Sequence, residues 1–279
     1  MDLGRIVEGT WLPPGSGHAK SEGGAKDGQY ARPKTRFHDE LVPEVGRYHL
    51  YISRACPWAH RVALIRELKG LDHAIPMTIV DPVIENDGWA FDTEHDPDPI
   101  GGARFLREVY VKAKPDFSGT VTVPVMWDKA KGTIANNESR EILRMLDRGW
   151  NAIARDTTSY CPPDLEADVE AAITSMYTPI NNGVYRSGFA TSQRAYEAAV
   201  KELFDALDAL DRVLGTQRYV CGDRLTEADI ALFPTLIRFD AVYHGHFKCN
   251  LRRIVDYEHL SGYLRELHQM PAVRRTVNL

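Results

Sequence analysis

The sequence predicts an extended arm followed by two folded units, an α/β unit and then an all-helical unit. The chain has 279 residues, which is well above the roughly 150 residues of an average domain, so two domains are expected. Short β-prone runs alternate with helical patterns between residues 46 and 150. Between residues 151 and 279, apolar residues recur only at helical spacing.

Composition and charge argue against several classes of protein. Apolar residues make up 43% and charged residues 26% of the chain, and the formal net charge is −5 with both signs interspersed. We therefore expect neither disorder nor nucleic-acid binding. No run approaches the roughly 18 apolar residues of a membrane span, so no membrane partner is expected. The 4 cysteines are too scattered for a disulfide scaffold, and no secretory leader is visible, which predicts a reducing cytoplasmic location.

Residues 1–45 are expected to form an extended N-terminal arm. Gly, Pro, Lys and Asp dominate the stretch from residue 10 to residue 46, and neither a helical nor a strand period is visible there. Such a stretch should either move freely or wrap around folded parts of the chain.

The α/β domain, residues 46–150, should open with a βαβ unit. Residues 49–52 and 75–80 are β-prone runs, and between them residues 58–69 carry apolar side chains on one helical face. The two strands should be parallel and joined by a right-handed crossover. Residues 81–100 are rich in proline and acidic residues and predict a long loop, which inside a compact domain is usually functional.

The rest of this domain should add two strands and two helices. A short helix is expected near residues 104–111, and residues 121–127 and 133–135 flank a turn typical of a β-hairpin. Pro124 cannot donate to a strand ladder, so Val123 and Pro124 should lie where a strand begins or face something other than a neighbouring strand. A helix with Asn-type caps should follow over residues 136–146. The order βαβ, long segment, ββα is that of the thioredoxin-like fold.

The all-helical domain should span residues 151–279. Thr226 and Asp229 have the spacing of a capping box at the start of one of its helices. The expected helices are residues 165–177, 196–214, 227–239 and 258–270.

Cys56 is the candidate nucleophile. It stands between the first predicted strand and the first predicted helix, where unpaired amides and the helix dipole favour a thiolate. We therefore expect the thiol to titrate below the free value of about 8.5. Ala59 replaces the second cysteine of a C-x-x-C motif, so an external thiol would have to resolve a mixed disulfide on Cys56. A buried structural cysteine is the alternative, and the strand-to-helix position argues against it.

Two further segments could bind a peptide-like ligand. The amides at Asn137-Glu138-Ser139 could take a carboxylate, with Glu138 left for an ammonium group; a plain helix cap is the alternative. Val123, if its bond to Pro124 is cis, could pair with an extended peptide; a plain edge strand is the alternative. His244, His246 and Cys249 have metal-ligand spacing, but no second cluster completes a site, so no metal is expected.

Six motifs together resemble the glutathionyl-hydroquinone reductases, the Xi-class glutathione transferases. They are Cys-Pro-Trp-Ala-His-Arg (56 to 61), Gly-Trp (88 to 89), Thr-Val-Pro-Val (122 to 125), Asn-Asn-Glu-Ser (136 to 139), Asn-Asn-Gly-Val-Tyr (181 to 185) and Phe-Asp-Ala-Val-Tyr-His-Gly-His-Phe-Lys-Cys-Asn (239 to 250).

The resemblance implies a glutathione transferase fold, a homodimer, and reduction of a glutathionyl-hydroquinone with glutathione as co-substrate and no metal. A mixed disulfide on the catalytic Cys56 would be resolved by a second glutathione. Tyr185 and Tyr243 resemble the family's pocket tyrosines and would serve catalysis at the acceptor. The implied glutathione contacts are Trp89, Val123, Glu138 and Ser139.

Two departures from the family pattern are visible. The family usually has an arginine before the Thr-Val-Pro-Val segment, where this chain has Thr120, so that ionic contact should be missing or come from elsewhere. The family also continues with a tyrosine-bearing segment beyond the position of Leu279.

Two other functions are compatible with parts of this pattern. An omega-type thiol transferase or dehydroascorbate reductase also uses a single cysteine, but tyrosines in the acceptor pocket argue against it. A non-catalytic interaction module with the same fold is the other alternative, and the presence of Cys56 argues against that one.

Overall fold

The computed structural model describes residues 3–16 and 26–278, which form two compact units. The first unit comprises the described parts of residues 1–23 and 33–157, and the second comprises those of residues 24–32 and 158–279. The arm is therefore shared, because most of it belongs to the first unit and a short stretch belongs to the second.

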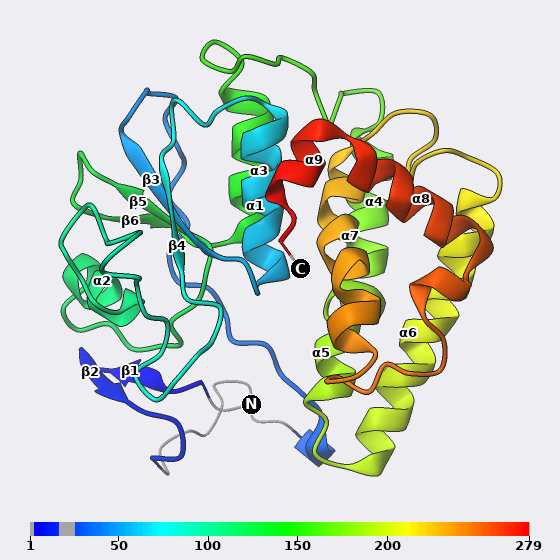
Figure 1. The fold of residues 1–279 in the computed structure, drawn as a ribbon, viewed down its shortest axis with the longest axis horizontal. Helices are drawn as coiled ribbons and strands as arrows, with labels where there is room; N and C mark the ends of the chain where they lie inside the picture. Colours follow the sequence, from blue (N-terminus) through cyan, green and yellow to red (C-terminus); the bar gives the residue numbers. More distant parts are fainter. Residues whose placement is uncertain (1–2, 17–25, 279) are drawn as a thin grey trace. The chain divides into compact units, whose positions relative to one another are not determined.

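A four-stranded sheet in the order β4-β3-β5-β6 organises the first unit (Figure 1). β3 (Tyr48–Ser53) pairs in parallel with β4 (Met77–Val80) and antiparallel with β5 (Val125–Asp128), which in turn pairs antiparallel with β6 (Thr133–Asn136). All residues of β3 are buried, as expected for a central strand covered on both faces. The mixed sheet confirms the predicted βαβ-ββα order.

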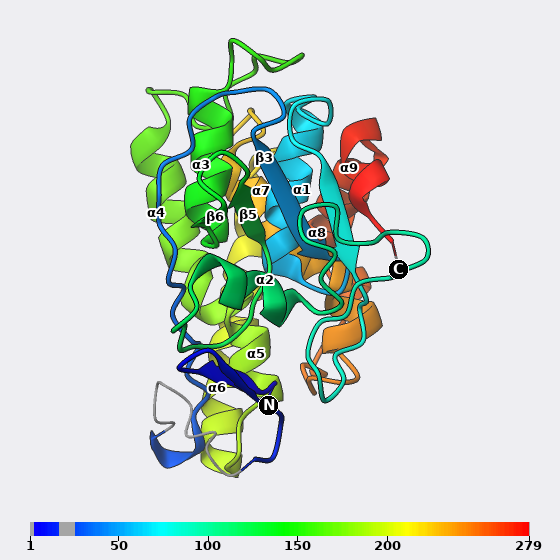
Figure 2. The ribbon, with the colours of Figure 1, turned by 90° about the vertical axis from the view of Figure 1, so that its left-hand side faces the viewer.

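Helices cover both faces of this sheet. α1 (Pro57–Leu68) and α3 (Ser139–Gly149) pack together on one face, and α2 (Leu106–Ala113) lies on the other (Figures 1 and 2). α1 begins at a proline, whose fixed φ suits the first helical turn. It ends before Gly70, which has a φ of 60° that glycine adopts without strain.

A short hairpin, β1 (Arg5–Val7) and β2 (Thr10–Leu12), opens the first unit. Its turn contains Gly9, with a φ of 77°, and β1 also pairs with the segment before β5, because the amides and carbonyls of Ile6 and Gly119 exchange two hydrogen bonds of 2.9 Å. The sequence did not predict this hairpin, since three-residue strands are too short to show alternation.

The described part of the second unit contains helices and turns but no strand. The four predicted helices are confirmed to within a few residues, and Thr226 and Asp229 form the predicted capping box. Two short helices were not predicted, because six residues make fewer than two turns. The elements are α4 (Glu166–Met176), η2 (Tyr177–Asn181), α5 (Gly183–Gly188), α6 (Gln193–Leu214), α7 (Glu227–Arg238), η3 (Phe239–Tyr243), η4 (Ile254–Asp256), α8 (Glu258–Gln269) and α9 (Pro271–Thr276).

Within the described residues, no helix is both long and apolar enough to cross a bilayer.

Candidate active site

Cys56 is the N-cap residue of α1 and has an extended backbone. Its sulfur accepts the amide N–H of Ala59 at 3.5 Å, and its thiol points to the carbonyl oxygen of Val123 at 3.6 Å. Two of the sequence-predicted site residues therefore meet at the mouth of α1. Because the N-cap sulfur already receives an amide hydrogen bond, the helix end is set up to stabilise a thiolate.

The three basic residues around Cys56 are placed differently from one another. Arg61 is buried, and its guanidinium carbon lies 4.4 Å from the ring centroid of Trp58. His60 is buried as well, whereas Arg54 is exposed. Arg61 thus packs on the indole of the first helical turn, and the α1 amide that the structure places at the sulfur is that of Ala59.

The bond between Val123 and Pro124 is cis, and Pro124 lies directly before β5 as predicted. Among the described residues, no group accepts a hydrogen bond from the Val123 amide. The same segment is tied to the core by Tyr110, whose hydroxyl donates to the carbonyl oxygen of Thr122 at 2.8 Å. Val123 therefore has a backbone N–H that can donate to a ligand, and the neighbouring Thr122 is held by Tyr110.

Glu138 is the N-cap residue of α3, so the helix begins at Ser139. The Glu138 carboxylate accepts the Arg140 amide at 3.2 Å and the Thr35 hydroxyl at 3.1 Å. The predicted Asn-type cap is therefore wrong in detail: the extended backbone at Glu138 places the cap there, and Asn136 instead accepts the Glu138 amide at 2.7 Å. The Ser139 side chain is buried beside it, 3.5 Å from the Glu138 carboxylate.

Asn137 links this turn to the N-terminal arm and to Tyr110. Its side-chain oxygen accepts the amides of Arg36 at 3.2 Å and Phe37 at 3.1 Å, and its side-chain nitrogen donates to the Tyr110 hydroxyl at 3.1 Å. Tyr110 consequently joins the segment before Val123 to the turn before Ser139. Tyr110 could not be predicted from the sequence, because its hydroxyl joins segments that are far apart in the chain.

Trp89 lies in the long segment between β4 and α2 and is 9% exposed. Its carbonyl oxygen accepts the amide of Leu106 at 2.9 Å. The preceding residues are held by Trp11 of β2, whose indole N–H donates to the carbonyl oxygen of Asn86 at 3.0 Å and whose ring lies against Gly88. The hairpin therefore fixes the backbone that carries Trp89.

Tyr185 and Tyr243 lie close together in the second unit. Tyr185 is on α5, Tyr243 ends η3, and their ring centroids are 6.3 Å apart. Phe247 packs edge-on against both rings, at 5.6 Å and 5.0 Å, and Phe189 lies 5.7 Å from Tyr185. Tyr243 is 2% exposed, whereas Tyr185 is half-buried. These four rings are called the aromatic cluster below.

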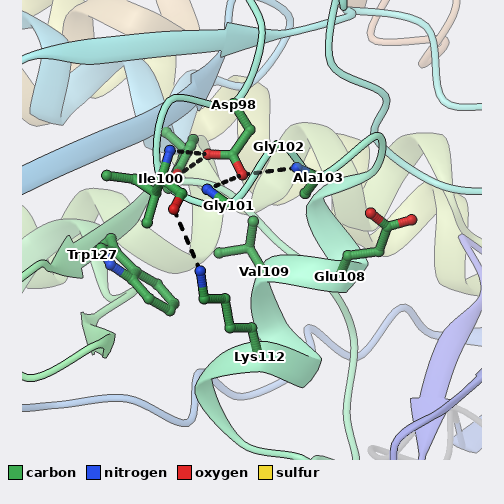
Figure 3. A pocket seen from close by; sticks show the side chains of 10 residues that line it. Asp98, Ile100, Gly101, Gly102, Ala103, Glu108, Val109, Lys112 and Trp127 are labelled. Atoms are coloured by element: carbon green, nitrogen blue, oxygen red, sulfur yellow. Dashed lines mark hydrogen bonds between the residues drawn. The ribbon is translucent and has the colours of Figure 1, made fainter.

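The first unit has a pocket of about 150 Å³ (Figure 3). None of the predicted site residues lines it. One lining residue is Asp98, which accepts the Tyr51 hydroxyl at 2.6 Å and the amides of Ile100, Gly101 and Ala103 at 2.9–3.0 Å. Although burial favours the neutral acid, these donors lower the pKa of Asp98. The carboxylate therefore organises the loop around it.

The described residues contain no group of three or more His, Cys, Asp or Glu side chains that could hold a metal ion. Cys249, which has metal-ligand spacing from His244 and His246, is buried, and burial raises the pKa of its thiol to about 12.

Family models match both units. The model described as "Glutathione S-transferase, N-terminal domain" matches residues 55–148, and the model described as "Glutathione S-transferase, C-terminal domain" matches residues 193–266.

Among curated proteins, the glutathionyl-hydroquinone reductase PcpF of Sphingobium chlorophenolicum is 44% identical over 283 residues, covering 99% of this chain and 89% of the relative. The glutathionyl-hydroquinone reductase YqjG of Escherichia coli is 42% identical over 294 residues, covering 99% and 88%.

Among solved structures, a Xi class GST from Natrialba magadii superposes with a TM-score of 0.91 at 45% identity, covering 99% of this chain and 86% of that one. The glutathione-bound structure of YqjG superposes with a TM-score of 0.84 at 44% identity, covering 87% and 84%. With this identity over almost its whole length, the chain belongs to the glutathionyl-hydroquinone reductases, the Xi class of the glutathione S-transferases.

Proposed function

We propose that the protein reduces glutathionyl-hydroquinones to hydroquinones, with glutathione as the reductant and a mixed disulfide on Cys56 as the intermediate. The observation that carries this proposal is the position of the sulfur, which accepts a helix N-terminal amide from Ala59 and lies beside the Val123 carbonyl. The residue that would hold a resolving thiol in a dithiol enzyme is that same Ala59. A free thiol from solution must therefore complete the cycle.

The first step breaks the bond between sulfur and the aromatic ring. The Cys56 thiolate attacks the sulfur of the glutathionyl adduct, a disulfide forms between Cys56 and glutathione, and the ring carbon leaves with the electron pair and takes a proton. In the second step a glutathione thiolate attacks the glutathionyl sulfur and releases the Cys56 thiolate. The products are hydroquinone and glutathione disulfide, so atoms and electrons balance.

Glutathione binding is assigned to Trp89, Val123, Glu138 and Ser139. Glutathione carries a carboxylate and an ammonium group at its γ-glutamyl end. The first amides of α3 and the Ser139 hydroxyl suit the carboxylate, and the Glu138 carboxylate suits the ammonium group. The Val123 backbone can pair with the cysteinyl part of the peptide by strand addition. The indole of Trp89 would contact glutathione from a segment that Trp11 of the hairpin holds in place.

Binding of the hydroquinone part of the substrate is assigned to Tyr185 and Tyr243. A phenol can both donate and accept a hydrogen bond, so these hydroxyls can bind the hydroquinone oxygens and pass the proton that the leaving ring requires. The aromatic cluster around them is the kind of surface on which a flat ring packs.

A turnover assay with purified protein, glutathione and glutathionyl-menadiol tests the proposal. Chromatography should show menadiol and glutathione disulfide forming in equal amounts with wild-type protein, and no turnover with Cys56→Ser or Cys56→Ala. Cys221→Ser is the matched control, because this free, half-buried cysteine lies outside the proposed site. Turnover above a few per cent in both Cys56 variants would contradict the proposal, and activity confined to small disulfides would favour an omega-type thiol transferase.

We also propose that the active form is a homodimer in a reducing cytoplasm. None of the four cysteines forms a disulfide, which suits a reducing compartment. Light scattering on the eluting protein measures the oligomer, and a monomer mass at working concentration would contradict the dimer.

A further inference from the structure

A stretch of the N-terminal arm is attached to the second unit. η1 (Lys26–Gly28) lies beside α5 and the start of α6 in both views (Figures 1 and 2). The carbonyl oxygen of Gly28 accepts the Thr191 amide at 2.9 Å, and that of Asp27 accepts the Ser192 hydroxyl at 2.8 Å. Because Ser192 is the N-cap of α6, these contacts fix the residues that follow η1 relative to the helices.

The residues that follow η1 reach the aromatic cluster. The ring of Tyr30 stacks on that of Tyr185, with centroids 6.2 Å apart and planes inclined by 24°, and it lies 5.3 Å from Phe189. The guanidinium carbon of Arg32 lies 4.5 Å from the centroid of the Tyr185 ring. Tyr185 is thus contacted by two side chains from a part of the chain about 150 residues earlier.

A hydrogen bond to Asn182 holds Arg32 in this position. Its Nε donates to the side-chain oxygen of Asn182 at 2.9 Å, and Asn182 stands directly before α5, the helix that carries Tyr185. A planar guanidinium can make such a hydrogen bond and still lie on a ring face, which a lysine ammonium does less well. The geometry therefore couples Arg32 to Tyr185 through both contact and charge.

The guanidinium of Arg32 lies over two tyrosine rings, those of Tyr30 and Tyr185. Burial raises the pKa of Tyr30, and the nearby Arg32 opposes that rise. A cation on the face of a phenol ring also stabilises negative charge that develops on the ring. A phenol that gives up its proton to a leaving group develops such charge.

We propose that Arg32 is a positioning residue for the reductase reaction, which fixes the Tyr185 ring and makes its hydroxyl a better proton donor to the departing hydroquinone ring. This inference rests on the proposed function. Tyr30 completes the arrangement, because its ring supports Tyr185 on the side of the arm. The arm would then supply part of the acceptor site.

The test compares two reactions that differ in their leaving group. With glutathionyl-menadiol a carbon leaves and needs a proton, whereas with hydroxyethyl disulfide a thiolate leaves and needs none. Arg32→Met should lower kcat on glutathionyl-menadiol by about 5- to 30-fold, the equivalent of a cation–π contact. The KM for glutathione and the rate on hydroxyethyl disulfide should stay at wild-type values. Arg32→Lys, which restores the cation, should recover part of the loss.

Arg252→Met is the matched control. Arg252 also covers a tyrosine ring in the second unit, with its guanidinium carbon 4.4 Å from the centroid of Tyr257, but that tyrosine lies outside the aromatic cluster. This variant should keep wild-type kcat on both substrates.

Failure of this inference and failure of the proposed function give different results. Wild-type kcat in Arg32→Met would overturn the inference alone. Equal losses on both substrates, or a lower Tm with no recovery in Arg32→Lys, would also overturn it and leave Arg32 a purely structural role. Wild-type protein inactive on glutathionyl-menadiol would overturn the proposed function and this inference together.

Discussion

The sulfur of Cys56 lies 3.6 Å from the carbonyl oxygen of Val123, so the mouth of α1 and the segment before β5 meet at the thiol. These parts are 67 residues apart in the chain, and the sheet brings them together because β3 and β5 are neighbours. A peptide paired with the Val123 backbone would therefore run past the sulfur. Under the proposed function, a glutathione bound along Val123 would thus bring its sulfur to Cys56.

The first prediction concerns the reactivity of Cys56. Because its sulfur accepts the Ala59 amide at the N-terminus of α1, the thiolate should form readily, and the rate of alkylation by iodoacetamide should have a midpoint below about 8.5 on the pH axis. Peptide mapping separates the sites. Cys221 is the internal comparison, since burial raises the pKa of its thiol. A midpoint for Cys56 at or above that of Cys221 would show that the helix end does not activate it.

The second prediction concerns the two tyrosines of the aromatic cluster. Tyr185→Phe and Tyr243→Phe should each lower kcat/KM on glutathionyl-menadiol by roughly 5- to 150-fold, the loss of one hydrogen bond worth about 1–3 kcal/mol. The dissociation constant of glutathione, measured by calorimetry, should not change. Unchanged kinetics in the double variant, or a parallel fall in Tm, would remove both tyrosines from the acceptor site.

The third prediction concerns Tyr110. Its hydroxyl bonds to Thr122 and Asn137, so Tyr110→Phe should leave a buried amide without its acceptor and lower the free energy of unfolding by about 1–3 kcal/mol. Glutathione should also bind more weakly, because both flanking segments lose their common support. Urea unfolding and calorimetry measure the two effects.

Tyr196→Phe is the control for Tyr110→Phe. Its hydroxyl also donates to a carbonyl, that of Lys248 at 2.7 Å, but at an exposed site in the second unit. If the Tyr110 variant bound glutathione as tightly as this control, the proposed support of the glutathione site would be wrong.

The fourth prediction concerns pH. Burial lowers the pKa of His49 to about 4 from 6.5, so the unfolded chain takes up a proton at a higher pH than the folded one. The contribution of His49 to the free energy of unfolding is therefore complete above pH 6.5 and is lost as the pH drops towards 4. The loss should reach about 3 kcal/mol, at 1.36 kcal/mol for each pH unit between the two values.

His49→Gln should remove this contribution. Urea unfolding of the variant between pH 4 and 7 should give a free energy that depends less steeply on pH than that of the wild type. Identical slopes for the two proteins would show that His49 is not the group responsible.

Local signals were sufficient to predict much of the fold. The β-prone run at β3, the helical face of α1 and Pro124 at the start of β5 each reflect a rule that operates within a few residues. Cys56 could be found in the same way, because a cysteine followed by proline at a helix start is a local pattern. The same rules placed the cap of α3 one or two residues too early, since they do not report the backbone conformation at Glu138.

What the sequence did not predict depends on distant contacts. Tyr30 and Arg32 lie in a stretch without periodicity, and only the attachment of η1 to α6 brings them to Tyr185. In the sequence, Tyr110 is indistinguishable from an ordinary core residue of α2. Its role becomes visible only in the structure, where its hydroxyl contacts Thr122 and Asn137. Neither arrangement leaves a local pattern in the chain.

Trapping the intermediate tests whether Cys56 carries the glutathionyl group. Wild-type protein should be mixed with glutathionyl-menadiol in the absence of free glutathione, and its intact mass and peptide map recorded. We expect a single glutathionyl group in disulfide linkage on Cys56, with one equivalent of menadiol released, and loss of that group when glutathione is added. Release of menadiol without an adduct on Cys56, or equal release of menadiol by Cys56→Ser, would contradict this result.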